Sequence, residues 1–203
     1  MVQAPEAPLV LREMTIEEWA DLDEDEPGEL VDGRLEEEEM PTFLHETVVS
    51  WLLRALGAWV AARGGFAFGS EAKYAVGAKR GRKPDVTVYF AGRPLPARGA
   101  SVARTPPSIA AEVISTRPRD ARRDRIDKLA DYRAFGVDQY WLIEPRLRVI
   151  EIIAYEGATR QPTIKLTVST GKHEIPGCNG LVLDFDDLWA EVDRLPDDGS
   201  EGD

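Results

Sequence analysis

The sequence contains a single cysteine, Cys178, and no apolar run close to the roughly 20 residues that a transmembrane helix needs. One cysteine cannot form a disulfide framework within the chain, and it cannot supply a thiolate metal cluster. The N-terminal residues also lack a basic stretch followed by a long apolar segment, the pattern of a secretory signal. We therefore expect a cytoplasmic protein without a membrane partner.

Basic residues are scarce overall, because 25 Lys and Arg stand against 37 Asp and Glu and give a formal net charge of -12. This balance argues against a polyanionic partner for the chain as a whole, but the charge is unevenly distributed. Residues 73–133 contain 15 basic and 6 acidic residues, a local net charge of +9, which leaves -21 for the rest. The basic middle could bind a polyanion, although such clusters also occur as ordinary solvated surface.

The length of 203 residues and the hydrophobic content of 43% suffice for one domain with a sizeable core. Much of the acidic excess lies in short polar segments near the start and in the final DDGSEGD. We therefore expect residues 1–195 to form a single domain and residues 196–203 to be a disordered acidic tail.

Helical periodicity is strongest after Thr42. Apolar residues recur at helical spacing over residues 48–60, and Gly64-Gly65 follows, which predicts one long helix with an apolar stripe. Asp120 is a candidate cap for a second helix that runs through Phe135. Its Ile126, Leu129, Ala130 and Arg133 lie along one side, and shorter helices are expected near residues 17–22 and 185–193.

Apolar runs bounded by turn residues predict strands in most of the remaining chain. Asp32-Gly33, between apolar residues 30–31 and Leu35, predicts a hairpin. Further strands are expected at residues 66–68, 71–76, 84–90, 108–114, 139–145, 148–156 and 164–169. The order of helices and strands predicts an α/β protein of mixed α+β type, with a mixed central sheet flanked by helices.

One acidic residue lies inside an apolar strand. In the segment SIAAEVI, Glu112 precedes Val113, and strand alternation places Glu112 on the same side as Ala110 and Ile114. An unpaired buried carboxylate is so costly that it takes up a proton, pairs with a cation or binds a metal ion. Glu112 is therefore a candidate site residue, and a salt bridge to a nearby arginine is the alternative.

A second carboxylate begins the preceding strand, where Asp85 follows Pro84. If the two strands pair, Asp85 and Glu112 could converge, and their oxygen ligands would suit a hard divalent cation such as Mg²⁺. Two alternatives remain open. Asp85 taken alone is better explained as a turn residue, and both acids could belong to a structural ion network with arginines.

Several ordered motifs resemble the Uma family of restriction endonucleases, a branch of the PD-(D/E)XK nuclease superfamily. They are GELVDGRL, FLHETVVSWLLRAL, RKPDVTVYF and IAAEVISTRPRDARRDRIDKLADYRAFGVDQYWLIEP, which span residues 29–145, with a C-terminal echo in EIPGCNGLVLDFDDLW. The resemblance implies a restriction-endonuclease-like core and metal-dependent hydrolysis of phosphodiester bonds in DNA. It assigns the two acids of the signature to Asp85 and Glu112. We expect these acids and the Ile114 backbone carbonyl to hold Mg²⁺, with Mn²⁺ able to take its place.

The chain departs from the superfamily pattern at Ile114, where a lysine would follow Glu112 by two residues. The Uma-type pattern instead supplies the basic residue from the next helix, where Lys128 stands one turn before Tyr132. Lys128 is the leading candidate for the catalytic lysine. Lys73 is the competitor, and the plain alternative is that Lys128 only pairs with Asp124 across an exposed helix face.

Other residues are weaker candidates for the site. Glu29 matches the family's first motif and could add a third carboxylate, although a Glu that begins a hairpin is usually solvated. His45 lies where the family commonly has a histidine, yet it is also explained as a core or helix-start histidine. Ser115 completes the Glu-x-x-Ser pattern that begins at Glu112.

The basic residues that flank the two acids are expected to contact DNA phosphates, which gives affinity without sequence information. They are Lys79, Arg80, Arg82, Lys83, Arg117, Arg119, Arg122, Arg123 and Arg125. Cutting both strands usually needs two sites, so a homodimer is expected. The alternative function is a catalytically inactive nuclease-fold module that binds nucleic acid or a protein partner, which the missing lysine at position 114 and the global acidity favour.

Overall fold

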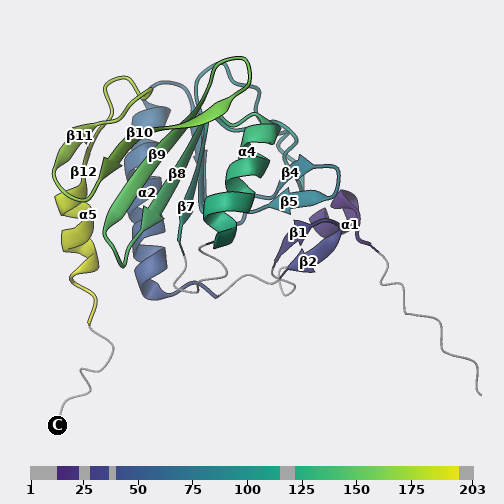
Figure 1. The fold of residues 1–203 in the computed structure, drawn as a ribbon, viewed down its shortest axis with the longest axis horizontal. Coiled ribbons are helices and arrows are strands. Elements are labelled where there is room, and N and C mark those ends of the chain that lie inside the picture. Colours follow the sequence, from purple (N-terminus) through teal and green to yellow (C-terminus); the bar gives the residue numbers. More distant parts are fainter. Residues whose placement is uncertain (1–12, 23–27, 37–39, 115–121, 197–203) are drawn as a thin grey trace, which may run out of the picture.

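The computed structural model describes residues 13–22, 28–36, 40–114 and 122–196 (Figure 1). At its centre is a six-stranded sheet in the order β10-β9-β8-β7-β6-β3. Neighbouring strands are antiparallel except β7 and β8, which are parallel. The strands are β3 (Phe66–Phe68), β6 (Val86–Tyr89), β7 (Ile109–Val113), β8 (Gln139–Glu144), β9 (Val149–Glu156) and β10 (Gln161–Val168).

The parallel pair needs a crossover connection, which contains a helix in two parts. Arg123–Lys128 forms the π-helix η1, and Leu129–Phe135 continues it as α4. Gly136 then adopts a left-handed conformation, with φ 105°, and ends the helix. The expected cap at Asp120 lies outside the described residues. On the expected apolar side Ile126 is 54% exposed, and the helix instead buries charged side chains and Tyr132.

Helices cover both faces of the central sheet (Figure 1). On one face lie α2 (Phe43–Ala61) and α5 (Phe185–Val192), which pack apolar side chains against alternate residues of β6, β7 and β8. On the other face, Tyr132 of α4 packs against Tyr140 and Leu142 of β8. The N-terminus of α2 is capped by the Thr42 hydroxyl, which accepts a hydrogen bond from the His45 amide.

A smaller four-stranded sheet lies beside the central one, in the order β2-β1-β5-β4 (Figure 1). Its first two strands form the predicted hairpin, with Asp32 and Gly33 both at positive φ in the turn. The short helix α1 packs its Trp19 against this sheet. The elements are α1 (Ile16–Ala20), β1 (Glu29–Val31), β2 (Arg34–Glu36), β4 (Tyr74–Gly77) and β5 (Arg80–Arg82).

The structure confirms the mixed sheet flanked by helices and differs from the sequence prediction in three short strands. Arg80–Arg82 was expected in a turn but forms β5, paired with both β1 and β4. Lys172–Glu174 and Val182–Asp184 form a separate two-stranded sheet as β11 and β12. All three strands are too short to show a clear apolar alternation. In the described part of the chain, no helix combines the length and the apolar character that crossing a bilayer requires.

Gly81 of β5 lies against the ring of Trp19, and a Cβ added there would stand 2.3 Å from the nearest ring carbon. We expect Gly81→Ala to lower the free energy of unfolding by about 1–3 kcal/mol, because the ring has no room to retreat in a buried site. Gly99→Ala is the matched control, since a Cβ at Gly99 meets no atom within 4 Å. Urea unfolding of both variants measures the difference, and equal stability would contradict the packing described here.

Candidate active site

The two predicted acids are brought together by the pairing of β6 with β7. Asp85 immediately precedes β6, and Glu112 lies on β7, where Val86 is paired with Ala111. The Asp85 carboxylate accepts a hydrogen bond from the Val113 amide at 2.7 Å, so it is fixed beside Glu112. Ile114 follows β7, and its amide donates to the Ile143 carbonyl oxygen at 2.7 Å.

Glu112 is buried, and both of its carboxylate oxygens are engaged. Oε2 lies 2.9 Å from Nζ of Lys128, and Oε1 accepts a hydrogen bond of 2.6 Å from the Tyr132 hydroxyl. Burial raises the pKa of Glu112 well above its ordinary value, and the negative charges of Asp85 and Asp124 act in the same direction. The positive charge of Lys128 opposes this shift. Burial is thus the main reason that the pKa of Glu112 is raised.

Lys128 lies among three carboxylates that come from three different elements. Its Nζ is 2.9 Å from Glu112, 3.3 Å from Glu29 and 3.4 Å from Asp124. All four side chains are buried, so the Lys128–Asp124 pair does not lie on an exposed helix face as the plain alternative assumed. Burial raises the pKa of Asp124, with the charges of Lys128 and Arg123 opposing it.

The π-helix places these charges in the interior. η1 buries Asp124 and Lys128, and Tyr132 follows on the buried side of α4. Tyr140 of β8 donates a hydrogen bond to the backbone carbonyl oxygen of Asp124 at 2.9 Å and so anchors this turn to the sheet. π-helical turns are rare and are frequently found at functional sites.

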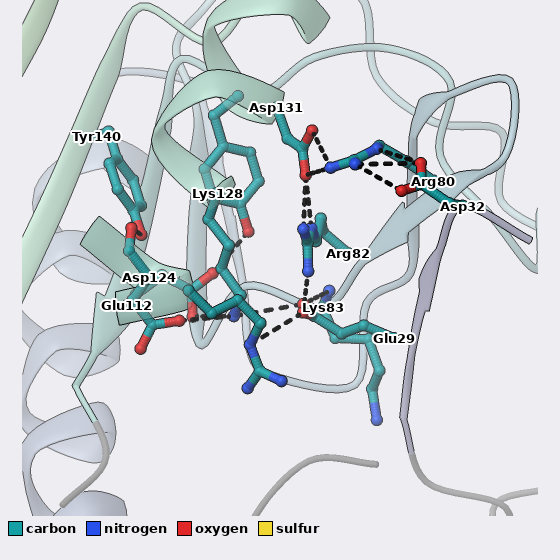
Figure 2. A network of polar contacts seen from close by, with 12 residues as sticks. Glu29, Asp32, Arg80, Arg82, Lys83, Glu112, Asp124, Lys128, Asp131 and Tyr140 are labelled. Atoms are coloured by element: carbon teal, nitrogen blue, oxygen red, sulfur yellow. Dashed lines mark hydrogen bonds and ion pairs between the residues drawn. The ribbon is translucent and has the colours of Figure 1, made fainter. Parts of the chain in front are cut away.

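Glu29 completes the site from the small sheet, and it is fully buried instead of solvated. Its Oε1 accepts from the Lys83 amide at 2.9 Å, and its Oε2 accepts from Arg82 at 2.6 Å. Burial alone would raise the pKa of Glu29, but the charges of Lys128 and Arg82 outweigh it and lower the pKa. Figure 2 shows this carboxylate between Arg82 and Lys128.

His45 approaches the other acid from the first turn of α2. Its Nε2 is 3.3 Å from the Asp85 carboxylate, and its Nδ1 is 3.4 Å from Glu46. Burial would lower the pKa of His45, but hydrogen bonding and attraction to Asp85 outweigh it and raise the pKa. The structure therefore brings His45 to the site edge beside Asp85.

Lys73 lies elsewhere. Its ammonium donates to the backbone carbonyl oxygens of Trp19, Ala20 and Leu22 at 3.0–3.3 Å, where it satisfies the C-terminal end of α1. The geometry thus favours Lys128 over Lys73 as the lysine of the site. Ser115 falls outside the described residues, as do Arg117 and Arg119.

The basic residues expected to contact phosphates mostly hold carboxylates. Arg82 and Arg123 are buried, and Arg82 pairs with Glu29 and Asp131, so phosphate contact by Arg82 is incompatible with this geometry. Arg122 is exposed. The other pairs are Lys79 with Glu13, Arg80 with Asp32 and Asp131, Lys83 with Glu71, and Arg125 with Glu144 and Glu151.

The donor chemistry of the site fits a hard cation. Among the described residues, no group of three or more Asp, Glu, His or Cys side chains has a metal-binding arrangement. Asp85 and Glu112 nevertheless present carboxylate oxygens, each with more than one lone pair, next to the backbone of Ile114. A divalent cation beside Glu112 would favour the charged form of its carboxylate, whose pKa burial raises.

The sequence did not identify two residues, Tyr132 and Asp131, as part of the site. Tyr132 was noted only for its place one turn after Lys128, and that spacing was the signal for its role as a second partner of Glu112. Asp131 carried no signal, because an acidic residue in a charged helix is ordinarily solvated. Here it is buried and receives Arg80 and Arg82.

The fold is similar to that of a solved structure. The chain matches "Crystal structure of a putative nuclease belonging to DUF820" from Anabaena variabilis ATCC 29413, with a TM-score of 0.70 and 18% sequence identity. The match covers 88% of this chain and 99% of the other. No curated protein matches the chain.

A family model over residues 15–186 identifies the chain more closely. The model is Uma2, described as "Putative restriction endonuclease". The chain belongs to the Uma2 family, which confirms the family recognised from the motifs around Asp85 and Glu112.

Replacing the buried Lys128 should destabilise the fold far more than replacing a lysine at the surface. We expect Lys128→Met to lower the free energy of unfolding by about 3–5 kcal/mol, because three buried carboxylates lose their shared partner. Lys165→Met is the matched control, since Lys165 pairs with Glu156 at 2.6 Å at the surface, and we expect it to cost at most about 1 kcal/mol. Denaturant unfolding of both variants checks the contrast, and similar losses would refute it.

Proposed function

We propose that the protein is a metal-dependent endonuclease that hydrolyses phosphodiester bonds in DNA. The observation that carries the proposal is the 2.9 Å contact between Lys128 Nζ and Glu112 Oε2. It supplies, from the helix after β7, the lysine that the superfamily pattern would place at Ile114. Membership of the Uma2 family, whose description is "Putative restriction endonuclease", supports the same activity.

In this proposal Asp85, Glu112 and the backbone carbonyl of Ile114 hold Mg²⁺, with Mn²⁺ as an alternative ion. A bound ion would lower the pKa of a water molecule and offset the charge that develops on the phosphate. Lys128 orients that water or donates to a phosphate oxygen as negative charge builds up there. The Val113 amide and His45 hold the Asp85 carboxylate in place.

Tyr132 has a complementary part in orienting Glu112. Its hydroxyl donates to one carboxylate oxygen while Lys128 contacts the other, so the plane of the carboxylate is fixed by two donors. A fixed carboxylate does not have to be ordered when the substrate arrives, which lowers the cost of reaching the reactive geometry.

The DNA backbone is proposed to lie along the basic residues that are not fully buried: Lys79, Arg80, Lys83, Arg122 and Arg125, together with Arg117 and Arg119. Several of these pair with carboxylates at partly exposed positions, where an ion pair contributes little. Exchange of a carboxylate for a phosphate would therefore cost little. A homodimer would supply the second site for cutting both strands, and sedimentation of the purified chain as a monomer with DNA would contradict it.

Cleavage of supercoiled plasmid with Mg²⁺, Mn²⁺ or EDTA tests the nuclease proposal. We expect wild type to nick the plasmid only with metal, and we expect Asp85→Ala and Glu112→Gln to reduce the rate by about 100-fold or more, because each removes a ligand that acts in the transition state. Glu156→Gln is the control, since Glu156 is exposed on β9. Unchanged cleavage by Glu112→Gln would remove Glu112 from the mechanism.

One observation favours the second candidate, an inactive nuclease-fold module that binds nucleic acid or a protein. Both oxygens of Glu112 already have donors, and the described residues contain no preassembled set of three ligands. The two candidates differ in whether the acids bind metal.

Calorimetric titration with Mg²⁺ and Mn²⁺ separates these candidates. The nuclease proposal expects saturable binding to wild type that is lost in Asp85→Ala and retained in Glu156→Gln. Absence of binding to folded wild type, with DNA or partner binding that survives Asp85→Ala, would instead establish the inactive module.

A further inference from the structure

Arg82 is a fully buried arginine that does not contact either of the two proposed metal-binding acids. We infer that Arg82 is a positioning residue that holds Lys128 against Glu112 by way of Glu29 and Asp131. This inference rests on the proposed function and adds to it that Arg82 sets the position of the Lys128 ammonium. Figure 2 shows Arg82 between Glu29 and Asp131.

The first connection runs through Glu29. Arg82 Nη1 donates to Glu29 Oε2 at 2.6 Å, and the Lys83 amide donates to Oε1 at 2.9 Å. These two donors fix the plane of the carboxylate. Oε1 of Glu29 lies 3.3 Å from Nζ of Lys128, and the same Nζ lies 2.9 Å from Glu112.

The second connection runs through the helix that carries Lys128. Asp131 lies three residues after Lys128, and its Oδ2 receives Arg82 Nε at 2.8 Å and Nη2 at 2.6 Å. Arg80 adds contacts to the same carboxylate at 3.0 and 3.2 Å. Arg82 thus fixes the rotation of the helix through Asp131, and it fixes the carboxylate of Glu29, which contacts Lys128.

Only a guanidinium could make both connections from one side chain. Its rigid fork presents donors in two directions, whereas a lysine ammonium acts as a compact point charge. Removing the fork would leave Glu29 and Asp131 without a shared donor, and Lys128 would lose the fixed carboxylate on one side. The positive charge that faces Glu112 would then be less precisely placed.

The test uses the reactivity of the Lys128 amine, which does not depend on cleavage activity. Folded wild type, Arg82→Lys and Asp131→Asn are acetylated briefly with an amine-reactive reagent, and modification of Lys128 relative to Lys165 is measured by mass spectrometry. Asp138→Asn is the matched control, because Asp138 also pairs with a partly buried arginine, Arg93, near the other end of the helix. Circular dichroism and urea unfolding establish that each variant is folded under the labelling conditions.

We expect Lys128 to be acetylated severalfold faster in Arg82→Lys and Asp131→Asn than in wild type, with Asp138→Asn unchanged. Equal labelling of all four proteins would overturn the inference. A rise in Asp138→Asn as large as in Asp131→Asn would also overturn it, since protection would then reflect general stability. The Asp131→Asn result decides the matter if Arg82→Lys does not fold.

A kinetic readout accompanies the labelling. Because a positioning residue acts on the reacting groups and not on DNA affinity, Arg82→Lys should lower kcat while KM stays near that of wild type. A rise in KM with unchanged kcat would overturn the inference. Absence of any cleavage by wild type would contradict the proposed function alone, and the labelling comparison would still decide whether Arg82 positions Lys128.

Discussion

The structure around β7 depends on one buried cation. The Lys128 ammonium is shared by Glu112, Glu29 and Asp124, which come from β7, β1 and η1. Carboxylates in an apolar interior are tolerated only when they are protonated or paired. A single ammonium therefore joins the central sheet, the small sheet and the crossover helix at one point.

From this point, charges of opposite sign alternate toward the surface. Glu112 contacts Lys128, which contacts Glu29; Arg82 joins Glu29 to Asp131. Arg80 then joins Asp131 to Asp32, whose side chain is 72% exposed. The alternation leaves each interior carboxylate beside a cation, while solvent reaches the outer end. Among the carboxylates of this network, Glu112 is the one whose pKa is raised well above its ordinary value, with burial as the main cause.

The sequence was sufficient to select Asp85, Glu112 and Lys128 as candidates, which the structure brings close together, but it did not reveal the residues that support them. Glu112 stood out because it interrupts an apolar strand, and Lys128 because the Uma-type pattern supplies its basic residue from the next helix. Arg82 was assigned to phosphate contact, because Arg80-Gly81-Arg82 has no apolar alternation and β5 was not foreseen. Burial of Arg82 depends on the pairing of β5 with β1 and β4, which is tertiary and leaves no local pattern in the sequence.

The alternation of side chains along β7 also bears on how the sheet reaches a single register. Ala111 and Val113 face the apolar layer under α2, while Glu112 faces Lys128 on the opposite side. A shift of β7 by one residue would drive the carboxylate into that apolar layer and leave Lys128 without one of its partners. A shifted pairing of β7 is thus strongly disfavoured, so the Glu112 carboxylate also specifies the alignment of β7 with β6 and β8.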